Sequence, residues 1–314
     1  SNEMKFLIVG RGSIALKHKS ILESSNHEVK LLHDFLEDSY SDDDIHQIFK
    51  DKVSEFDGAI IANASNKHFE FTKMALEKNK YIYLEKPPCL ELNELNELIN
   101  IESYVGKHIA VGFQLRFSNG INKLRDHMNE NIKNKILAFN IKVGQKLEDW
   151  RSGGINKNSY YANYDTGGGV IYELCHEIDL ALWLFGNPED VISKSANLSH
   201  PDMNIHDYCV SIWNYKDKIG TVSMDMIDPT YTRYIELIYR DHKILWNMDN
   251  DRLLKITKSE IKTLYEDNNF TRKSLIESSL KNFTDYIANS VSWGGAKLVE
   301  SINLLKIIDN MHHE

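Results

Sequence analysis

A glycine-rich segment near the start of the chain has the residue types and spacing that bind a phosphate group. It reads Gly10-Arg-Gly-Ser-Ile-Ala15 and follows directly after an apolar run at residues 5–9. In a dinucleotide-binding turn, two glycines permit the tight turn and a close backbone approach to the pyrophosphate, and a third small residue lets the helix pack on the strand. The phosphate then lies at a helix N-terminus, where unpaired N–H groups stabilise an anion. The segment therefore predicts such a turn, with an ordinary glycine-rich turn as the alternative. Its expected cofactor contacts are Gly10, Arg11, Gly12, Ser13, Ile14 and Ala15.

A carboxylate lies where the adenosine ribose of a dinucleotide would be bound. Asp34 follows the second expected strand at about 20 residues beyond the glycines. There it would accept the ribose hydroxyls and repel a 2′-phosphate, which favours NAD over NADP. Lys30 and Arg11 could instead pair with a 2′-phosphate, so NADP stays an alternative, as does a solvated loop carboxylate at this position.

A lysine follows another buried strand at its carboxyl end. The segment Tyr83-Leu-Glu-Lys-Pro-Pro88 ends at the sheet edge where ligands bind in open α/β folds. Held there, Lys86 can polarise a carbonyl or hydroxyl oxygen beside a nicotinamide ring. A surface ion pair between Glu85 and Lys86 is the alternative.

Three polar side chains are spaced by three residues in the second half of the chain. Glu173, His176 and Asp179 would share one face if residues 170–185 form one helix. A histidine between two carboxylates suits proton transfer with a hydroxyl group. The alternatives are a structural histidine and a metal site made of these three residues. No metal is expected, because hydride transfer with a nicotinamide needs none.

The pattern of elements that must position these residues changes near the first third of the chain. From residue 5 to about 118, short apolar runs alternate with helical periods and end in a strand at 108–111. This alternation predicts βαβ units and a parallel sheet. After residue 130, closely spaced strand candidates predict an antiparallel sheet, with helices at 170–185, 274–290 and 296–311. The length of 314 residues suits two domains.

Composition narrows the classes of partner. The chain has 37 Lys and Arg against 46 Asp and Glu, a net charge of −9, which argues against a nucleic-acid or anionic-lipid surface. No apolar run approaches the roughly 18 residues of a transmembrane helix, and the basic and apolar regions of a secretory signal are missing. Three scattered cysteines make neither a disulfide framework nor a zinc spacing. We expect a cytoplasmic protein with no nucleic-acid or membrane partner.

Five segments in order resemble the Gfo/Idh/MocA family, the glucose–fructose oxidoreductase and inositol dehydrogenase type. Besides the glycine turn and the Lys86 segment, they are residues 63–68 (Asn-Ala-Ser-Asn-Lys-His), residues 112–117 (Gly-Phe-Gln-Leu-Arg-Phe) and the Gly-rich helix at residues 167–186. The resemblance implies an α/β protein with an N-terminal Rossmann domain, and the change of pattern along the chain places its bounds at residues 4–118. It also implies a C-terminal α+β domain, residues 119–314, with a large, open, mainly antiparallel sheet that serves in a homodimer or homotetramer.

The resemblance also assigns roles to residues. Lys86 corresponds to the family lysine and His176 to the family histidine, and Glu173 is expected to act with them. Many members carry aspartate where this chain has Tyr172, and Glu173 instead matches a subgroup found with surface-sugar biosynthesis enzymes. The other implied contacts are Ala62, Asn63, Asn66, His68, Glu85 and Lys86 for the cofactor, and Arg116, Trp150, Arg151, Tyr160 and Asp179 for the substrate.

Two of these residues can be interpreted from their chemistry as well. Arg151 could bind a carboxylate or phosphate of the substrate with two parallel hydrogen bonds, and Trp150 could stack on a sugar ring. A surface ion pair and core packing are the respective alternatives.

The resemblance implies a hydride transfer between a nicotinamide cofactor and a hydroxyl or keto carbon of a sugar, sugar nucleotide or cyclitol. In this hypothesis His176 takes the hydroxyl proton while Lys86 holds the oxygen, although the sequence does not fix which of the two accepts the proton. Two other functions stay open: NAD-dependent glycoside cleavage or elimination with no net redox change, and a non-catalytic nicotinamide-binding regulator.

Overall fold

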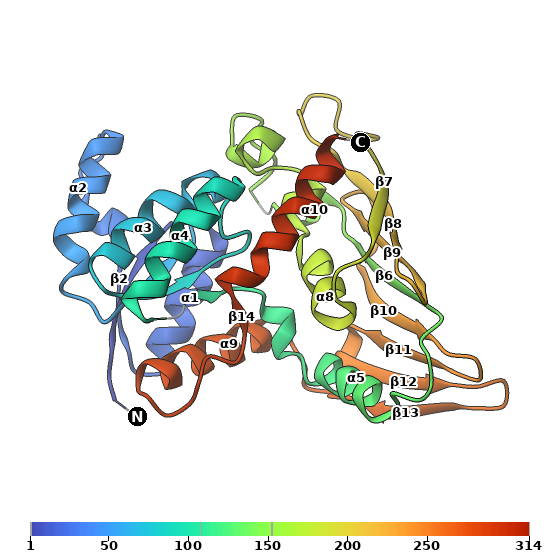
Figure 1. Cartoon of the computed structure of the whole chain (residues 1–314). Helices are drawn as coiled ribbons and strands as arrows, with labels where there is room; N and C mark the ends of the chain where they lie inside the picture. The colour runs from blue at the N-terminus through green and yellow to red at the C-terminus, as the bar shows by residue number, and fades with distance from the viewer. Residues whose placement is uncertain (1, 108, 152, 314) are drawn as a thin grey trace. The chain divides into compact units, whose positions relative to one another are not determined.

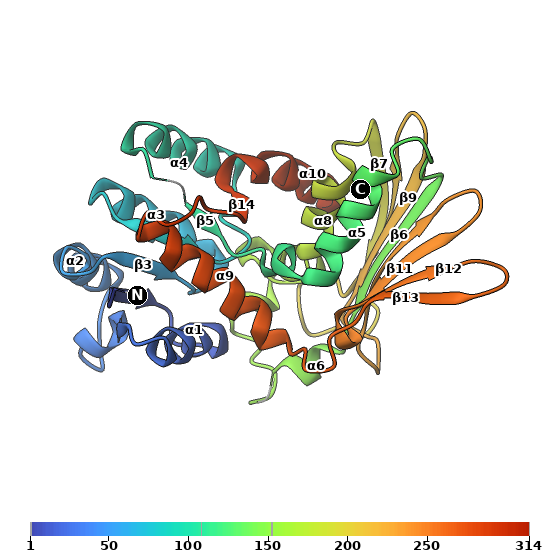
Figure 2. The same cartoon turned by 90° about the horizontal axis from the view of Figure 1, so that it is seen from below.

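The computed structural model describes residues 2–107, 109–151 and 153–313 and divides the chain into two compact units. The first unit comprises Ser1–Gln114 with Ile276–Ile302, and the second comprises Leu115–Leu275 with Asn303–Glu314. Figures 1 and 2 show the elements of each unit from two sides. Residues 276–302 thus return to the first unit, whereas the predicted domain boundaries at 118 and 119 stay a prediction.

The first unit is built on a six-stranded sheet in the order β14-β5-β4-β3-β1-β2. Neighbouring strands run parallel, except that β14 is antiparallel to β5. The central strands are apolar on both faces and buried, as the continuous apolar runs indicate. The sheet confirms the predicted parallel Rossmann arrangement. Its strands are β1 (Lys5–Val9), β2 (Glu28–Leu31), β3 (Gly58–Ile61), β4 (Tyr81–Leu84), β5 (Ala110–Val111) and β14 (Ala296–Lys297).

Helices follow the strands of this sheet. One helix shows how the sequence sets its own start: Ser41 accepts a hydrogen bond from the Asp44 amide, and Asp44 accepts one from the Ser41 amide. The apolar residues Ile45, Phe49 and Val53 then recur every four residues and are buried. The helices are α1 (Ser13–Ser24), α2 (Asp42–Val53), α3 (His68–Glu77), α4 (Leu92–Val105) and α9 (Arg272–Ile287), of which α9 belongs to this unit from residue 276.

The second unit is built on an eight-stranded sheet in the order β13-β12-β11-β10-β6-β9-β8-β7. All neighbours are antiparallel except β6 and β9, which run parallel, so the predicted, mainly antiparallel sheet is confirmed. Along β8, Cys209, Ser211 and Trp213 are buried, whereas Val210 and Ile212 are exposed on the other face. The strands are β6 (Ala138–Gly144), β7 (Asp190–Ala196), β8 (Tyr208–Asn214), β9 (Ile219–Asp225), β10 (Thr232–Ile238), β11 (Lys243–Asn247), β12 (Arg252–Ile256) and β13 (Ile261–Tyr265).

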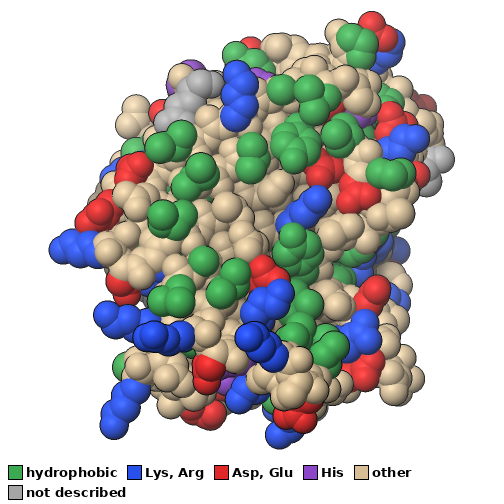
Figure 3. All heavy atoms as spheres, turned by 90° about the vertical axis from the view of Figure 1, so that its right-hand side faces the viewer, with side chains coloured by type: hydrophobic (Ala, Val, Ile, Leu, Met, Phe, Trp, Pro, Cys, Tyr) green, Lys and Arg blue, Asp and Glu red, His purple; other side chains and the backbone are tan. Residues whose placement is uncertain are grey.

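Helices pack on one face of this second sheet. Helix α8 contacts β6 and β9, and α5 contacts β11 and β12. In Figures 1 and 2, no helix of the described residues covers the opposite face, which Figure 3 presents to the viewer. The helices are α5 (Asn119–Glu130), α6 (Leu147–Trp150), α7 (Val170–Glu173), α8 (His176–Phe185) and α10 (Ser301–His313).

Four expectations about elements need correction or limits. The helix expected at 170–185 is two helices, because Leu174 (φ −106°, ψ 25°) leaves the helical conformation after α7. The helix expected from residue 296 begins at Ser301, because Ala296 and Lys297 pair with β5 instead. Strand β13 was not expected. The strand expected at 108–111 is present as β5, and His108 lies outside the described residues.

Candidate functional site

The glycine turn lies between β1 and α1 and has the backbone that its sequence requires. Gly10 has φ +120°, and a Cβ atom there would lie 2.5 Å from the carbonyl oxygen of Ala62, so only glycine fits. A Cβ on Gly12, in contrast, would meet nothing within 4 Å. Gly12 is the N-cap of α1, and Ala15 is fully buried against the sheet. Open space therefore lies over a helix N-terminus, as a phosphate needs.

Asn63 follows the neighbouring strand β3 at the same edge of the sheet. Its Oδ1 atom is buried and has no hydrogen-bond partner among the described residues. A buried acceptor without a partner is costly, so a donor supplied by a ligand would satisfy it. Asn66, two residues into the following turn region, is exposed, and Ala62 is buried.

His68 connects the loops that follow β3 and β4. Its Nδ1 lies 2.7 Å from the carbonyl oxygen of Pro87, and its Nε2 lies 3.1 Å from that of Asn63. The ring is buried, and burial, outweighing its hydrogen bonds to the carbonyls of Pro87 and Asn63, holds its pKa below the usual value. Both ring nitrogens thus contact protein carbonyls, and the predicted role of His68 as a cofactor contact stays a prediction.

Lys86 and Glu85 differ sharply in exposure at the end of β4. The Glu85 side chain is only 8% exposed and lies 2.7 Å from His18 Nε2. Gln114 Nε2 donates a second hydrogen bond, 2.9 Å long, to the same Glu85 oxygen. Lys86 is half-buried. Because β4, β3 and β1 are consecutive in the sheet, Lys86, Asn63 and the glycine turn follow the carboxyl ends of three adjacent strands.

Asp34 lies in a short 3₁₀ helix directly after β2 and is exposed. Its neighbour His33 has a lowered pKa, chiefly because it is partly buried and also because the positive charge of Arg11 acts on it. Arg11 from the glycine turn and Asp34 therefore lie in one neighbourhood. A carboxylate and an arginine beside each other keep both the ribose of NAD and the 2′-phosphate of NADP open as ligands.

The residues of the first unit fit a bound dinucleotide. Open space above Gly12, the unpartnered Asn63 oxygen and the exposed Asp34 are features that the protein's own packing does not use. The glycine turn would hold the pyrophosphate, Asp34 the ribose, and Asn63 the nicotinamide end of the cofactor.

In the second unit, the expected face of Glu173, His176 and Asp179 is interrupted. Glu173 ends α7, and His176 begins α8, so the prediction that all three stack on one helix is wrong for Glu173. His176 is half-buried at the first turn of α8, and Asp179 follows one turn later and is buried. The helix break thus falls between the histidine and the carboxylate that precedes it.

Glu173 contacts Arg151 instead. Arg151 Nη2 donates a 2.7 Å hydrogen bond to Glu173 Oε1, and the guanidinium lies 3.9 Å from the centre of the Tyr161 ring. Tyr160 lies beside this pair, and burial together with the Glu173 charge raises its pKa. Three of the predicted site residues, Arg151, Tyr160 and Glu173, are thus brought together. The preceding Trp150 has a buried indole N–H with no partner among the described residues.

Arg116 and Asp179 bind each other. Arg116 Nε and Nη2 donate hydrogen bonds of 2.9 and 2.7 Å to the two Asp179 oxygens, and both side chains are only 5% exposed. Such a buried, two-pronged ion pair is typical of a structural contact. A role in substrate binding stays a prediction for both residues.

Sequence reasoning missed two further polar groups in this unit. Arg233 on β10 donates two hydrogen bonds to the buried Glu177, the residue after His176. His200 lies 2.8 Å from the buried Asp207 and 3.1 Å from Glu148. Glu148 is close in sequence to Trp150 and Arg151. A charged residue next to a candidate histidine, Glu177, was the one available signal. The Arg233–Glu177 and His200–Glu148 partners are more than 50 residues apart in sequence, so no local pattern indicated these pairs.

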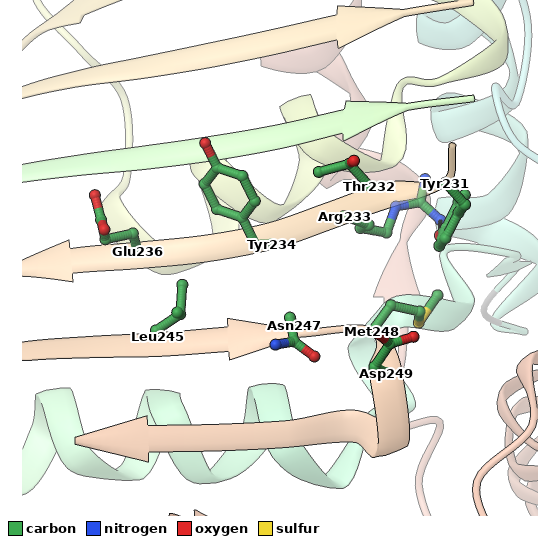
Figure 4. A pocket seen from close by; sticks show the side chains of 9 residues that line it. All are labelled: Tyr231, Thr232, Arg233, Tyr234, Glu236, Leu245, Asn247, Met248 and Asp249. Atoms are coloured by element: carbon green, nitrogen blue, oxygen red, sulfur yellow. Dashed lines mark hydrogen bonds between the residues drawn. The ribbon is translucent and has the colours of Figure 1, made fainter. Parts of the chain in front are cut away.

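A cavity of about 400 Å³ opens on β10 and β11, and none of the predicted site residues lines it. Figure 4 shows the tyrosine, glutamate and asparagine side chains that border it. The lining residues are Tyr231, Thr232, Arg233, Tyr234, Glu236, Leu245, Asn247, Met248 and Asp249.

The part of the chain that the structure describes contains neither a metal-binding cluster nor a membrane-spanning helix. Among the described residues, no group of three or more His, Cys, Asp or Glu side chains is placed to hold a metal ion. Within the same residues, no helix combines the length and apolar character needed to cross a membrane.

Comparison with known families agrees with the fold and with the glycine turn. Residues 4–113 match the model of an oxidoreductase family with an NAD-binding Rossmann fold, and residues 121–243 match the GFO/IDH/MocA C-terminal domain. The chain belongs to this GFO/IDH/MocA family. The predicted family, fold class and NAD-binding Rossmann domain are therefore confirmed.

Individual curated relatives match this chain at low sequence identity. Inositol 2-dehydrogenase from Salmonella typhimurium is 28% identical over 147 residues, which cover 45% of this chain and 38% of that protein. 2,7-Anhydro-N-acetylneuraminate hydratase from Escherichia coli is 27% identical over 148 residues, covering 46% and 38%. The match thus spans well under half the length of each of these curated relatives. An inositol dehydrogenase homolog complexed with NAD⁺ from Azotobacter vinelandii has the same fold, with a TM-score of 0.83, 12% identity and coverage of 100% and 95%.

Proposed function

We propose that the protein is an NAD-dependent dehydrogenase or reductase that acts on a CH–OH group of a sugar, sugar nucleotide or cyclitol. One observation carries the proposal: the open glycine turn, the unpartnered Asn63 oxygen and Lys86 follow the carboxyl ends of three adjacent strands. In open α/β sheets this edge is where cofactor and substrate meet. The relative named inositol 2-dehydrogenase supports a polyhydroxy substrate.

Lys86 and His176 carry the chemistry in this proposal. When bound, the nicotinamide supplies the acceptor or donor of the hydride. Lys86 holds the substrate oxygen and stabilises the negative charge that develops on it, because an ammonium group is a fixed positive charge. His176 exchanges the hydroxyl proton.

Glu173 and Arg151 have a supporting role in the proposal. The 2.7 Å contact fixes the arginine, while its buried Nε has no partner among the described residues. A substrate carboxylate or phosphate would satisfy this donor, and the buried Trp150 N–H could donate beside it. An acidic sugar or a sugar nucleotide from a surface-glycan pathway would supply such a group.

Replacement of Lys86 tests the proposal. Lys86→Ala is expected to lower kcat by about 100-fold or more, because charge stabilisation at the oxygen is lost, while NADH still binds. Turnover would be measured by reduced-nicotinamide absorbance on the best substrate from a panel of cyclitols, sugars and sugar nucleotides, and NADH binding by fluorescence titration.

Lys73→Ala is the matched control, because Lys73 is a surface lysine of the same unit that pairs with Glu97. It should leave both measurements unchanged. Full turnover by Lys86→Ala with cofactor bound would overturn the assignment.

A second candidate function uses the same site with no net redox change. The relative named as a hydratase favours it, because hydration consumes no NAD. Product analysis distinguishes the two functions. Substrate conversion that needs NAD⁺ but accumulates no NADH indicates elimination or hydration, whereas stoichiometric NADH indicates a dehydrogenase.

We also propose a homodimer or homotetramer formed through the uncovered face of the eight-stranded sheet. Figure 3 shows hydrophobic side chains among charged ones on this side of the molecule. Ile192, Val210, Ile212 and Ile219, on β7, β8 and β9, are all exposed, and Ile192 lies opposite Ile212 in the sheet register. Exposed apolar residues that adjoin one another are typical of an interaction surface.

A further inference from the structure

Glu85 lies directly before Lys86, and its side chain is buried. Its carboxylate is enclosed by residues of the first unit: His18 on α1 and Gln114 after β5 both contact Oε1. Gln114 Nε2 also donates to the Tyr83 hydroxyl, which contacts the Ser279 hydroxyl. A Cβ on Gly112 would lie 3.1 Å from Glu85 Oε2, so the backbone also closes on the carboxylate. These residues make a continuous buried polar network under the Lys86 turn.

The Glu85 carboxylate is ionised. Burial by itself raises the pKa of Glu85, but the hydrogen bond and charge of His18 and the charge of Lys86 outweigh burial, so the pKa lies below its usual value. Two N–H donors aimed at one oxygen stabilise the anion in the same way.

His18 contacts Glu85 through Nε2, at 2.7 Å. Its Nδ1 is buried with no hydrogen-bond partner among the described residues.

We propose that Glu85 is a positioning residue with an electrostatic role. Its buried negative charge, held by His18 and Gln114, offsets the Lys86 ammonium at the end of β4 and so favours the oxidised, positively charged nicotinamide over the reduced one. The proposal rests on the proposed function, in which the nicotinamide ring lies at this edge.

The ratio of the dissociation constants for NAD⁺ and NADH tests the proposal without any substrate. Glu85→Gln keeps the shape and the hydrogen-bond acceptor but removes the charge. We expect the ratio Kd(NAD⁺)/Kd(NADH), measured by calorimetry, to rise about fivefold or more. Water screens a charge in a partly buried site only weakly, so its loss should weaken the binding of the positively charged NAD⁺. In turnover, the loss of kcat on Glu85→Gln should largely vanish when Lys86 is already alanine, because Glu85 acts through Lys86.

Two His18 variants complete the test. His18→Gln can still donate a neutral hydrogen bond to Glu85, so the ratio should stay within about twofold of the wild type. His18→Leu removes one of the two donors and favours the protonated acid, so the ratio should rise as in Glu85→Gln. This variant keeps the test decisive if Glu85→Gln does not fold.

The outcomes distinguish the role of Glu85 from the proposed function on which it rests. A wild-type protein that binds neither NAD⁺ nor NADH overturns the proposed function. Wild-type binding with an unchanged ratio in Glu85→Gln and His18→Leu overturns the role of Glu85 alone. A shift of the ratio in His18→Gln would mean that His18 carries a compensating positive charge, which also overturns it.

Discussion

Arg151 and Glu173 form an ion pair whose partners have unequal surroundings. The Arg151 side chain is 26% exposed and that of Glu173 is 11% exposed. Tyr161 covers one face of the guanidinium, and Tyr160 lies against both groups. A pair this poorly exposed to water depends on both charges, because removing one takes away a contact that solvent only partly replaces.

We expect Arg151→Met to lower the free energy of unfolding by about 1–3 kcal/mol, because it leaves Glu173 without its cation. Adding Glu173→Gln should restore part of that loss. Urea unfolding of the two single variants and the double variant would measure the coupling. Strictly additive losses would show that the 2.7 Å contact contributes nothing to stability.

At this scale, the sequence predicted residue types better than their partners. The glycine turn could be predicted because its spacing reflects local backbone geometry, such as the positive φ of Gly10. That Arg116 binds Asp179, 63 residues away, could not, because nothing local connects them. The same holds for Glu177 and Arg233, which are 56 residues apart. Long-range ion pairs depend on the tertiary fold, so a charged residue expected to meet substrate can instead meet another side chain.

Among elements, the last turn of α10 packs against the segment that carries Glu173. The His312 ring lies 4.7 Å from the Tyr172 ring and 5.6 Å from the Tyr164 ring, centre to centre. The His206 ring stacks on the His312 ring, with 6.0 Å between the ring centres. Burial chiefly, with the charges of His206 and His313, lowers the pKa of His312 to about 4. The last turn of α10 therefore packs against α7 through the His312 ring, whose lowered pKa disfavours protonation.

This contact should make stability depend on pH. Above pH 6.5 His312 is neutral in both states. As the pH falls from 6.5 to about 4, the unfolded chain takes up a proton that the folded chain refuses, so stability falls. Below about 4 both states are protonated and the loss is complete, at most about 3 kcal/mol for a pKa lowered from 6.5 to about 4.

His312→Phe keeps a ring in the stack and should lose less stability than the wild type between pH 7 and 4.5, as measured by urea unfolding. The exposed His313 is the matched control: its charge is a minor cause of the lowered His312 pKa beside burial, so His313→Phe should stay close to the wild-type pH profile. Parallel profiles for wild type and His312→Phe would refute the role of His312.

The elements themselves were predictable where a simple period dominates. Continuous apolar runs gave β1 and β3, and alternation gave β8. The break between α7 and α8 was not predictable, because Leu174 and Cys175 are compatible with a continuous helix and the local packing decides the conformation. Strand β14 has two residues and exists only because β5 is beside it.

For the whole molecule, the uncovered sheet face gives a direct test of assembly. Ile212 on β8 is 46% exposed and lies opposite Ile192, which is 60% exposed. If copies of the chain associate through this face, Ile212→Lys should weaken association by about tenfold or more, because a charge would be buried among apolar side chains. Light scattering after size-exclusion chromatography, over a range of concentrations, would report the mass.

Ile132→Lys serves as the control for that experiment, because Ile132 is 80% exposed but lies outside the strands of the sheet. It should leave the mass unchanged, since an exposed apolar side chain away from the interface loses nothing when it is charged. A wild-type protein that is monomeric at every concentration would refute assembly through this face. If Ile212→Lys keeps the oligomer intact, the copies associate through another surface, and the apolar residues of β7, β8 and β9 have a different partner.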